Sequence, residues 1–190
     1  MIPLDAPFRP ATEADAPQLA ELVNFAGEGL PLHLWQGLAK AGEDPWQIGR
    51  ARQADKARDG QIVVVDTGGG AIAGLTGYVI GPEPIGADVP ALFRPLQELE
   101  NEAPDTWYVN VVACYPAHRG QGHGSRLLSL ADRIAQAEGM ERMSVIVAGD
   151  NMGARRLYER HGYGETARRA CIRDGWQTAT EEWVLLTKPL

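Results

Sequence analysis

The chain has 190 residues, of which 44% are hydrophobic, so it can bury one substantial core and we expect a single domain over residues 1–190. Its formal net charge of −7 offers no basic field that would attract nucleic acid or an anionic membrane surface, and both are excluded as expected partners. No segment approaches the roughly 20 apolar residues that span a bilayer.

The N-terminus and the cysteines indicate the compartment. The first ten residues, MIPLDAPFRP, lack a basic stretch followed by an apolar run. The two cysteines, Cys114 and Cys171, each lie in an apolar stretch, which predicts reduced core thiols and neither a disulfide framework nor a Cys-based metal site. These features predict a cytoplasmic protein.

The first half of the chain predicts a strand, helical segments and a hairpin. Residues 8–10 are typical of a short strand, and Thr12 is a good N-cap for the helix that follows. Residues 27–45 are broken by Gly and Pro, which favours short helical pieces separated by loops. Residues 62–66 and 71–80 are rich in β-branched residues and are joined by a Gly turn, so they predict a hairpin.

An acidic, Pro-rich insertion is expected over residues 81–106, which contain five prolines and six acidic residues, and a helix is expected around residues 92–102. The following run, Trp107–Tyr115, is almost continuously apolar and predicts a central strand buried on both faces. Apolar residues at helical spacing then predict a helix over residues 121–138, ended by Gly139.

The C-terminal part predicts a strand over residues 143–148, a shorter helix over residues 151–161 and a final strand pair, residues 166–173 and 180–188. Trp176 and Trp183 near this pair allow two interpretations. They pair across chains in a homodimer, or they are buried within one chain.

The segment Arg119-Gly120-Gln121-Gly122-His123-Gly124 lies between the buried strand and an amphipathic helix. Its glycines let backbone N–H groups approach a ligand, and the helix adds unpaired donors and the positive end of its dipole, which suits a pyrophosphate. A tight turn is the plainer interpretation. A dinucleotide-binding unit with Asp150 on a ribose is a third, but G-x-G-x-x-G would need glycine at Ser125 or Leu127.

Two ordered motifs resemble the GNAT acetyltransferase superfamily. Arg119, Gly122 and Gly124 match its Q/R-x-x-G-x-G/A signature, and the helical segment matches N-x-x-A-x-x-x-Y-x-x-x-G-F/Y through Asn151, Ala154, Tyr158, Gly162 and Tyr163. The resemblance implies an α/β (α+β) fold with a mixed, mostly antiparallel sheet of six or seven strands and helices on both faces. It also implies direct transfer of acetyl from acetyl-coenzyme A to a primary amine.

The resemblance assigns roles to individual residues. Tyr158 is expected to protonate the departing thiolate, and Asn151, seven residues earlier, is expected on the same helical face. The strand before the loop is expected to pair with the pantetheine arm, and the loop amides to hold the pyrophosphate. The expected cofactor-binding residues are thus Val112, Ala113, Cys114, Arg119, Gly120, Gln121, Gly122, His123, Gly124 and Asn151.

The base that deprotonates the amine is not identified by the motifs. Many family members place a carboxylate on the central strand, whereas this strand offers Tyr108 and Asn110. Glu28 and Asp105 are the acids to test, and with Asn110 they are the candidate contacts to the substrate. No metal site is expected, because His118 and His123 match no metal-binding spacing.

The expected acceptor is an amine of a small molecule or peptide, and the acidic residues between Glu83 and Asp105 favour a cationic one. Two alternatives remain open. One is a coenzyme A-binding regulatory module without turnover. The other is a Rossmann-type protein that binds NAD through the dinucleotide-binding unit described above.

Overall fold

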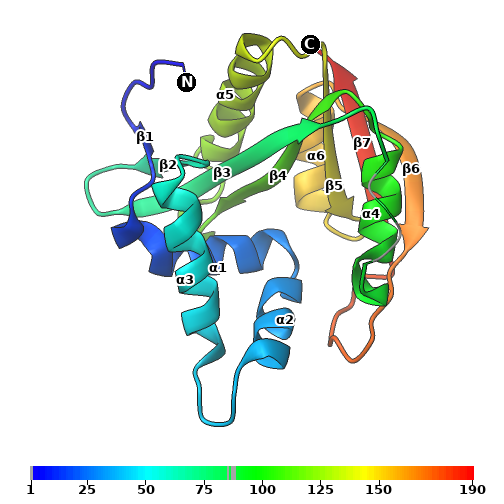
Figure 1. The fold of residues 1–190 in the computed structure, drawn as a ribbon. Coiled ribbons are helices and arrows are strands. Elements are labelled where there is room, and N and C mark those ends of the chain that lie inside the picture. Colours follow the sequence, from blue (N-terminus) through cyan, green and yellow to red (C-terminus); the bar gives the residue numbers. More distant parts are fainter. Residues whose placement is uncertain (1, 85, 87–88) are drawn as a thin grey trace. The chain divides into compact units, whose positions relative to one another are not determined.

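The structure is a computed structural model that describes residues 2–84, 86 and 89–190. Within these residues, seven strands form one sheet in the order β1-β2-β3-β4-β5-β7-β6 (Figure 1). The strands are β1 (Phe8–Pro10), β2 (Ile62–Asp66), β3 (Ala71–Ile80), β4 (Thr106–Cys114), β5 (Arg142–Ala148), β6 (Gly164–Ala170) and β7 (Glu182–Pro189).

Strand directions define the class of the sheet. The pairs β1/β2, β2/β3, β5/β7 and β6/β7 are antiparallel. Strands β4 and β5 run parallel, in register from Trp107↔Met143 to Val109↔Val145. The expected mixed, mostly antiparallel sheet is confirmed. It differs from the parallel sheet on which a dinucleotide-binding unit is built.

Six α-helices lie in the described part of the chain: α1 (Ala16–Ala26), α2 (Leu30–Leu38), α3 (Pro45–Arg58), α4 (Arg94–Asn101), α5 (His123–Ala137) and α6 (Met152–Arg160). The helix expected around residues 92–102 is confirmed as α4. Residues 85, 87 and 88 of the expected insertion, including its Asp88, lie outside the described residues.

Helix α3 was not predicted, because its apolar residues form no helical stripe. Its beginning nevertheless carries two standard signals. The Asp44 side chain accepts a hydrogen bond from the Trp46 amide at 3.1 Å, and Pro45 occupies the first turn. Lys56 and Arg58 in the last turn complement the negative end of the helix dipole.

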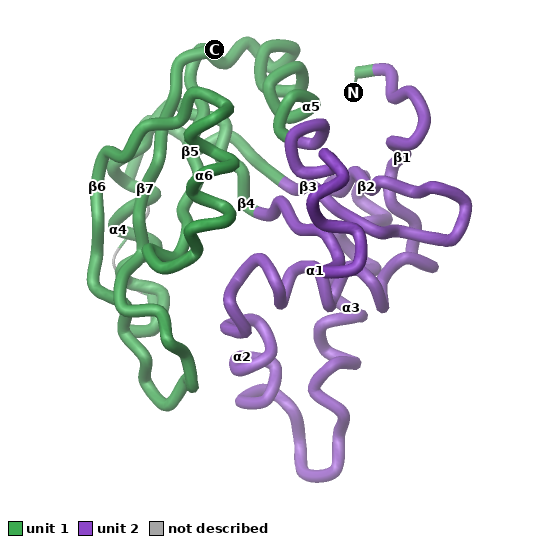
Figure 2. Tube along the Cα trace, turned by 180° about the vertical axis from the view of Figure 1, so that it is seen from behind, with its two compact units in different colours: residues 1–2, 77–110, 128–190 green, residues 3–76, 111–127 purple. Residues whose placement is uncertain are grey.

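The chain divides into two compact units, coloured separately in Figure 2. Apart from the first two residues, unit 1 comprises Gly77–Asn110 and Leu128–Leu190, and unit 2 comprises Pro3–Thr76 and Val111–Leu127. Strands β3 and β4 each contribute residues to both units.

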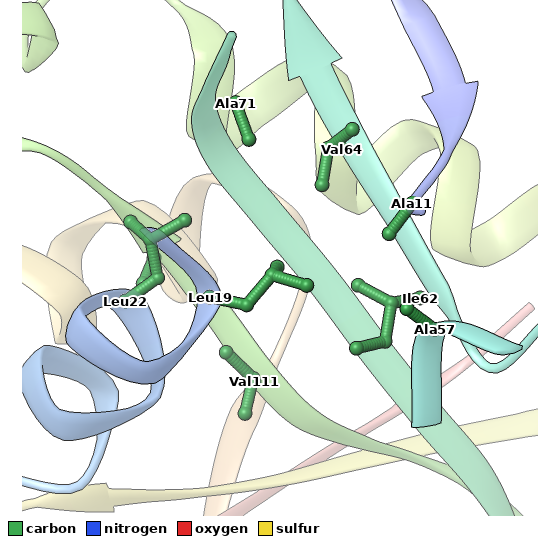
Figure 3. Packing of buried hydrophobic residues seen from close by; sticks show 9 residues of the cluster. Ala11, Leu19, Leu22, Ala57, Ile62, Val64, Ala71 and Val111 are labelled. Carbon is green, nitrogen blue, oxygen red and sulfur yellow. The ribbon is translucent and has the colours of Figure 1, made fainter. Parts of the chain in front are cut away.

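The core of unit 2 supports the end of β4. Leu19 and Leu22 of α1 gather with Ile62 and Val64 of β2 and with Val111 of β4 (Figure 3). These side chains are 7% exposed or less, so their burial supplies hydrophobic stabilisation that fixes this part of β4. The part of β4 that precedes the glycine loop is therefore held in place by the core of unit 2.

The core of unit 1 holds the beginning of β4. Thr106 Oγ1 of β4 and Ser144 Oγ of β5 form a buried hydrogen bond of 2.7 Å. Trp107 Nε1 donates a hydrogen bond to Glu138 at 3.2 Å. The Trp107 ring also lies against the backbone of Gly77 on β3. A Cβ at Gly77 would lie 2.1 Å from that ring, so the packing requires glycine there.

The two tryptophans near the last strands are buried within one chain. Trp176 and Trp183 are each 4% exposed, and their rings stack with centroids 6.1 Å apart. This outcome supports the second interpretation of the two and removes the basis for a homodimer through them. Cys114 and Cys171 are free thiols, but they are only partly buried rather than core residues.

Candidate functional site

The end of β4 presents the three residues expected to meet the pantetheine arm. Ala113 packs into the core of unit 2, while Val112 and Cys114 are half-buried. The Cys114 carbonyl accepts a hydrogen bond from Arg119 Nε at 3.1 Å, which folds the loop back onto the strand end. Burial raises the pKa of the Cys114 thiol, which disfavours its thiolate and hence a nucleophilic role.

The glycine loop follows a short 3₁₀ turn, Pro116–His118. Gly120 and Gly122 have φ values of 76° and 84°, in the left-handed region that side chains with a Cβ rarely adopt. A Cβ at either residue would meet nothing within 4 Å, so glycine is required there by backbone conformation and not by crowding. The open space leaves the loop backbone approachable.

Helix α5 begins at His123, two residues later than expected, so the loop amides and the first helical turn are continuous. The Arg126 amide donates to the Gly122 carbonyl at 3.0 Å, which closes the first helical turn. The amides of His123, Gly124 and Ser125 precede that bond and belong to the donors that a helix leaves unsatisfied. With the helix dipole they are suited to an anion.

His123 itself is buried in this turn, with 9% exposure. Its Nδ1 has no hydrogen-bond partner among the described residues. Gln121, also in the loop, is exposed and makes only a long contact of 3.4 Å to the Ala117 carbonyl. Apart from the hydrogen bond of Arg119 to Cys114, the loop side chains contribute little to its shape, which depends on the backbone.

Tyr158 lies in unit 1 on α6 and is only 6% exposed. Its ring meets Tyr163 edge to face, with centroids 5.6 Å apart. Burial raises the pKa of the Tyr158 phenol well above its ordinary value, so the group stays protonated at neutral pH.

Asn151 corrects one geometric expectation. Helix α6 begins at Met152, and Asn151 is its N-cap, with φ and ψ of −77° and 69°. Its Oδ1 accepts from the Ala154 amide at 3.0 Å. The helix therefore begins one residue later than expected, and Asn151 caps it instead of lying within it.

The three candidate substrate contacts come from different segments of the chain. Glu28 in unit 2 is half-buried between two glycines, with φ of 53°. In unit 1, Asp105 is exposed with φ of 54°, and its amide donates to the Ile80 carbonyl at 3.0 Å. Asn110 is exposed on β4. Positive φ at both acids indicates turn positions and by itself assigns no chemistry.

A group that the sequence reasoning missed lies in unit 1. Tyr78 on β3 donates its hydroxyl to Glu100 Oε2 on α4 at 2.9 Å, and its ring lies 5.2 Å from that of Tyr108 on β4. The sequence indicated only that the segment is acidic. Nothing in it distinguished Glu100 from Glu98 and Glu102.

Two features typical of other protein classes are absent from the described residues. No group of three or more His, Cys, Asp and Glu side chains is arranged to hold a metal ion. No helix in the same part of the chain has the length and apolar character needed to cross a membrane.

A family model described as Acetyltransferase (GNAT) family matches residues 32–163 of the chain. Among curated proteins, the chain is 36% identical over 52 residues to the uncharacterized N-acetyltransferase YycN of Bacillus subtilis (strain 168). That match covers 27% of this chain and 33% of the relative, so it spans about a third of the relative's length.

Solved structures with the same fold cover almost the whole chain. A mosquito arylalkylamine N-acetyltransferase like 5b superposes with a TM-score of 0.67 at 15% identity, covering 96% of this chain and 99% of the other. A ribosomal-protein-alanine N-acetyltransferase from Brucella melitensis gives a TM-score of 0.63 at 20% identity, with coverage of 96% and 99%. At these identities the likeness shows the fold alone.

Proposed function

The chain belongs to the GNAT acetyltransferase family, and from that premise we propose that it is an enzyme that transfers acetyl from acetyl-coenzyme A directly to a primary amine. The observation that carries the proposal is the glycine loop at the start of α5. There, positive φ at Gly120 and Gly122 and the first-turn amides of the helix combine in an approachable anion-binding backbone.

The acyl donor fits the residues that are present. Amides from Arg119 to Gly124 bind the pyrophosphate, and a Cβ at Gly122 would meet nothing within 4 Å, so the backbone there is open. The backbone of Val112–Cys114 pairs with the pantetheine arm and supplies donors for the oxyanion. Binding there releases the Cys114 carbonyl from Arg119, whose guanidinium then serves the phosphates.

Tyr158 is the proton donor to the departing thiolate. A thiolate leaves less readily than a thiol, and a phenol whose pKa is raised by burial holds its proton until that charge develops. Asn151 supports this step through the cap that fixes the start of α6, and it contacts the pantetheine or thioester. No metal is required by this mechanism.

The acceptor is a primary amine on a small molecule or a peptide. Both chemistries occur in the names of the structural neighbours, one an arylalkylamine N-acetyltransferase and the other a ribosomal-protein-alanine N-acetyltransferase. Tyramine and a peptide with N-terminal alanine are therefore the first acceptors to try. The protein acts in the cytoplasm and needs neither nucleic acid nor a membrane.

Thiol release from acetyl-coenzyme A tests the proposal, with Tyr158→Phe and Tyr163→Phe as a matched pair. Both variants remove one buried phenolic hydroxyl, and the Tyr163 hydroxyl has no partner among the described residues. We expect amine-dependent thiol release by the wild type and a fall in kcat of about 100-fold in Tyr158→Phe, with unchanged donor affinity. Tyr163→Phe should keep its kcat.

Two results contradict the proposal at different points. If the wild type releases no thiol with either acceptor, acetyl transfer to amines is wrong. If Tyr158→Phe keeps the wild-type kcat, the transfer stands and Tyr158 is not the acid.

A further inference from the structure

Glu98 and Glu100 of α4, and Glu102 directly after the helix, have different partners. Glu98 binds the guanidinium of Arg169 on β6 at 2.8 Å, and Glu102 binds the same group. Glu100 is two residues from each and so projects about 200° away around the helix. It has no cationic partner among the described residues, and its only hydrogen bond there comes from Tyr78. It is therefore a carboxylate without a counter-ion.

The surroundings of Glu100 are aromatic on the inner side and open on the outer side. Tyr108 is buried at 6% exposure, whereas Tyr78 is 41% exposed and Glu100 itself is half-buried. Negative charge on Glu100, Tyr78 or Tyr158 would raise the pKa of Tyr108, so these side chains lie within electrostatic range of it in unit 1. The carboxylate and the proposed acid thus both lie within electrostatic range of Tyr108.

This environment suits a primary ammonium group. A carboxylate without a cationic partner attracts the charge, and the ring of Tyr78, whose hydroxyl donates to the same carboxylate, adds aromatic surface beside it. Burial raises the pKa of Glu100, an effect that the hydrogen bond from Tyr78 partly offsets. A carboxylate of raised pKa is a stronger base and a more effective acceptor of the amine proton.

We propose that Glu100 binds the ammonium group of the acceptor and takes one of its protons, which assigns cationic primary amines as the acceptor class. The inference rests on the proposed acetyl transfer. It identifies Glu100 as the base that deprotonates the amine, which the motifs did not identify. This base lies on α4 and not on the central strand.

The proton balance is complete with the residues named. Glu100 takes one proton from the ammonium, and the neutral nitrogen forms its bond to the acetyl carbon. As the carbon–sulfur bond breaks, the sulfur receives the Tyr158 proton, and a second amine proton passes to the Tyr158 oxygen. Glu100 then releases its proton to solvent, so one proton is produced for each amide formed.

The test compares Glu100→Gln with Glu98→Gln on the same helix. Glutamine keeps an oxygen that accepts from Tyr78 but carries no charge, so folding should be preserved. The acceptor is tyramine or the alanine peptide, whichever the wild type acetylates. We expect Glu100→Gln to lower kcat/KM for this acceptor by about 100-fold at pH 7.5. Its affinity for acetyl-coenzyme A, measured by calorimetry, should be unchanged. Glu98→Gln should stay within about 2-fold of the wild type.

A pH series separates proton transfer from a structural role. The Glu100→Gln deficit should shrink as pH rises toward the pKa of the amine, because more acceptor then arrives neutral. The groups that face Glu100, Tyr78 and Tyr108, keep their protons over this range, since burial raises the pKa of both. Arg169 lies toward Glu98 and Glu102 and stays charged.

Three results would contradict the role of Glu100, the proton transfer or the proposed function. An active wild type with Glu100→Gln within 3-fold of it refutes the role of Glu100 and leaves the proposed function standing. A deficit that is constant with pH refutes the proton transfer. A wild type that acetylates neither probe refutes the proposed function, and this inference with it.

Discussion

Replacing Gly77 by alanine should be among the most damaging single-methyl changes in β3. The new Cβ would lie 2.1 and 2.3 Å from two atoms of the Trp107 ring and 2.6 Å from the Tyr108 carbonyl oxygen. The ring is buried at 3% exposure and the oxygen belongs to the backbone, so neither can rotate away. Overpacking of this kind costs about 3 kcal/mol, the upper end of its usual range.

Gly74→Ala on the same strand is the matched control. Its Cβ would make ordinary contacts of 3.6 and 3.7 Å to Leu22 and Leu19. Alanine also restricts the unfolded chain, which stabilises a protein by roughly 0.4–1 kcal/mol. In thermal unfolding followed by circular dichroism, Gly77→Ala should lower Tm by roughly 6–12 °C, and Gly74→Ala should leave it unchanged or raise it slightly. Equal Tm values for the two variants would refute the packing argument.

The remaining predictions concern an ion pair and a helix cap. The Arg9 guanidinium lowers the pKa of the buried Asp15 to about 2, below its ordinary 3.8, so this carboxylate stabilises the fold by about 2 kcal/mol above pH 4 and loses that contribution as pH falls through 2. Urea unfolding should show this acid-side loss in the wild type and not in Asp15→Asn; equal pH dependence contradicts it. Asn151→Ala should cost about 1 kcal/mol through loss of the 3.0 Å bond to the Ala154 amide, and Asn151→Ser should restore it. If Asn151 also holds the donor, the Ser variant regains Tm without regaining acetyl-coenzyme A affinity.

Local patterns predicted the parts of the fold that depend on local chemistry. The apolar run from Trp107 to Tyr115 predicted a central strand, and β4 occupies Thr106–Cys114. The hairpin of β2 and β3 followed from β-branched residues around a Gly turn. Helix α3 was missed, because tertiary packing and capping hold a helix that has no apolar stripe.

Long-range pairing limited what the sequence predicted about the site. The glycine loop was predictable, since its strand, positive-φ residues and helix are contiguous in the chain. The Tyr78–Glu100 hydrogen bond joins β3 to α4 across 22 positions. The sequence alone could not show which of Glu98, Glu100 and Glu102 would accept it. Asn151 was expected as the first residue of a helix, whereas the capping preference of Asn places it just before α6.

Calorimetric titration with acetyl-coenzyme A tests the central claim most directly, with Gly122→Trp and Gly139→Trp as the compared variants. Both glycines have positive φ and open space around a Cβ, at opposite ends of α5, so the strain is matched and only the position differs. Acetyl-coenzyme A should bind the wild type and Gly139→Trp and should not bind Gly122→Trp, because the indole occupies the pyrophosphate position. Equal binding by Gly122→Trp, or binding of NAD without acetyl-coenzyme A by the wild type, would contradict the account.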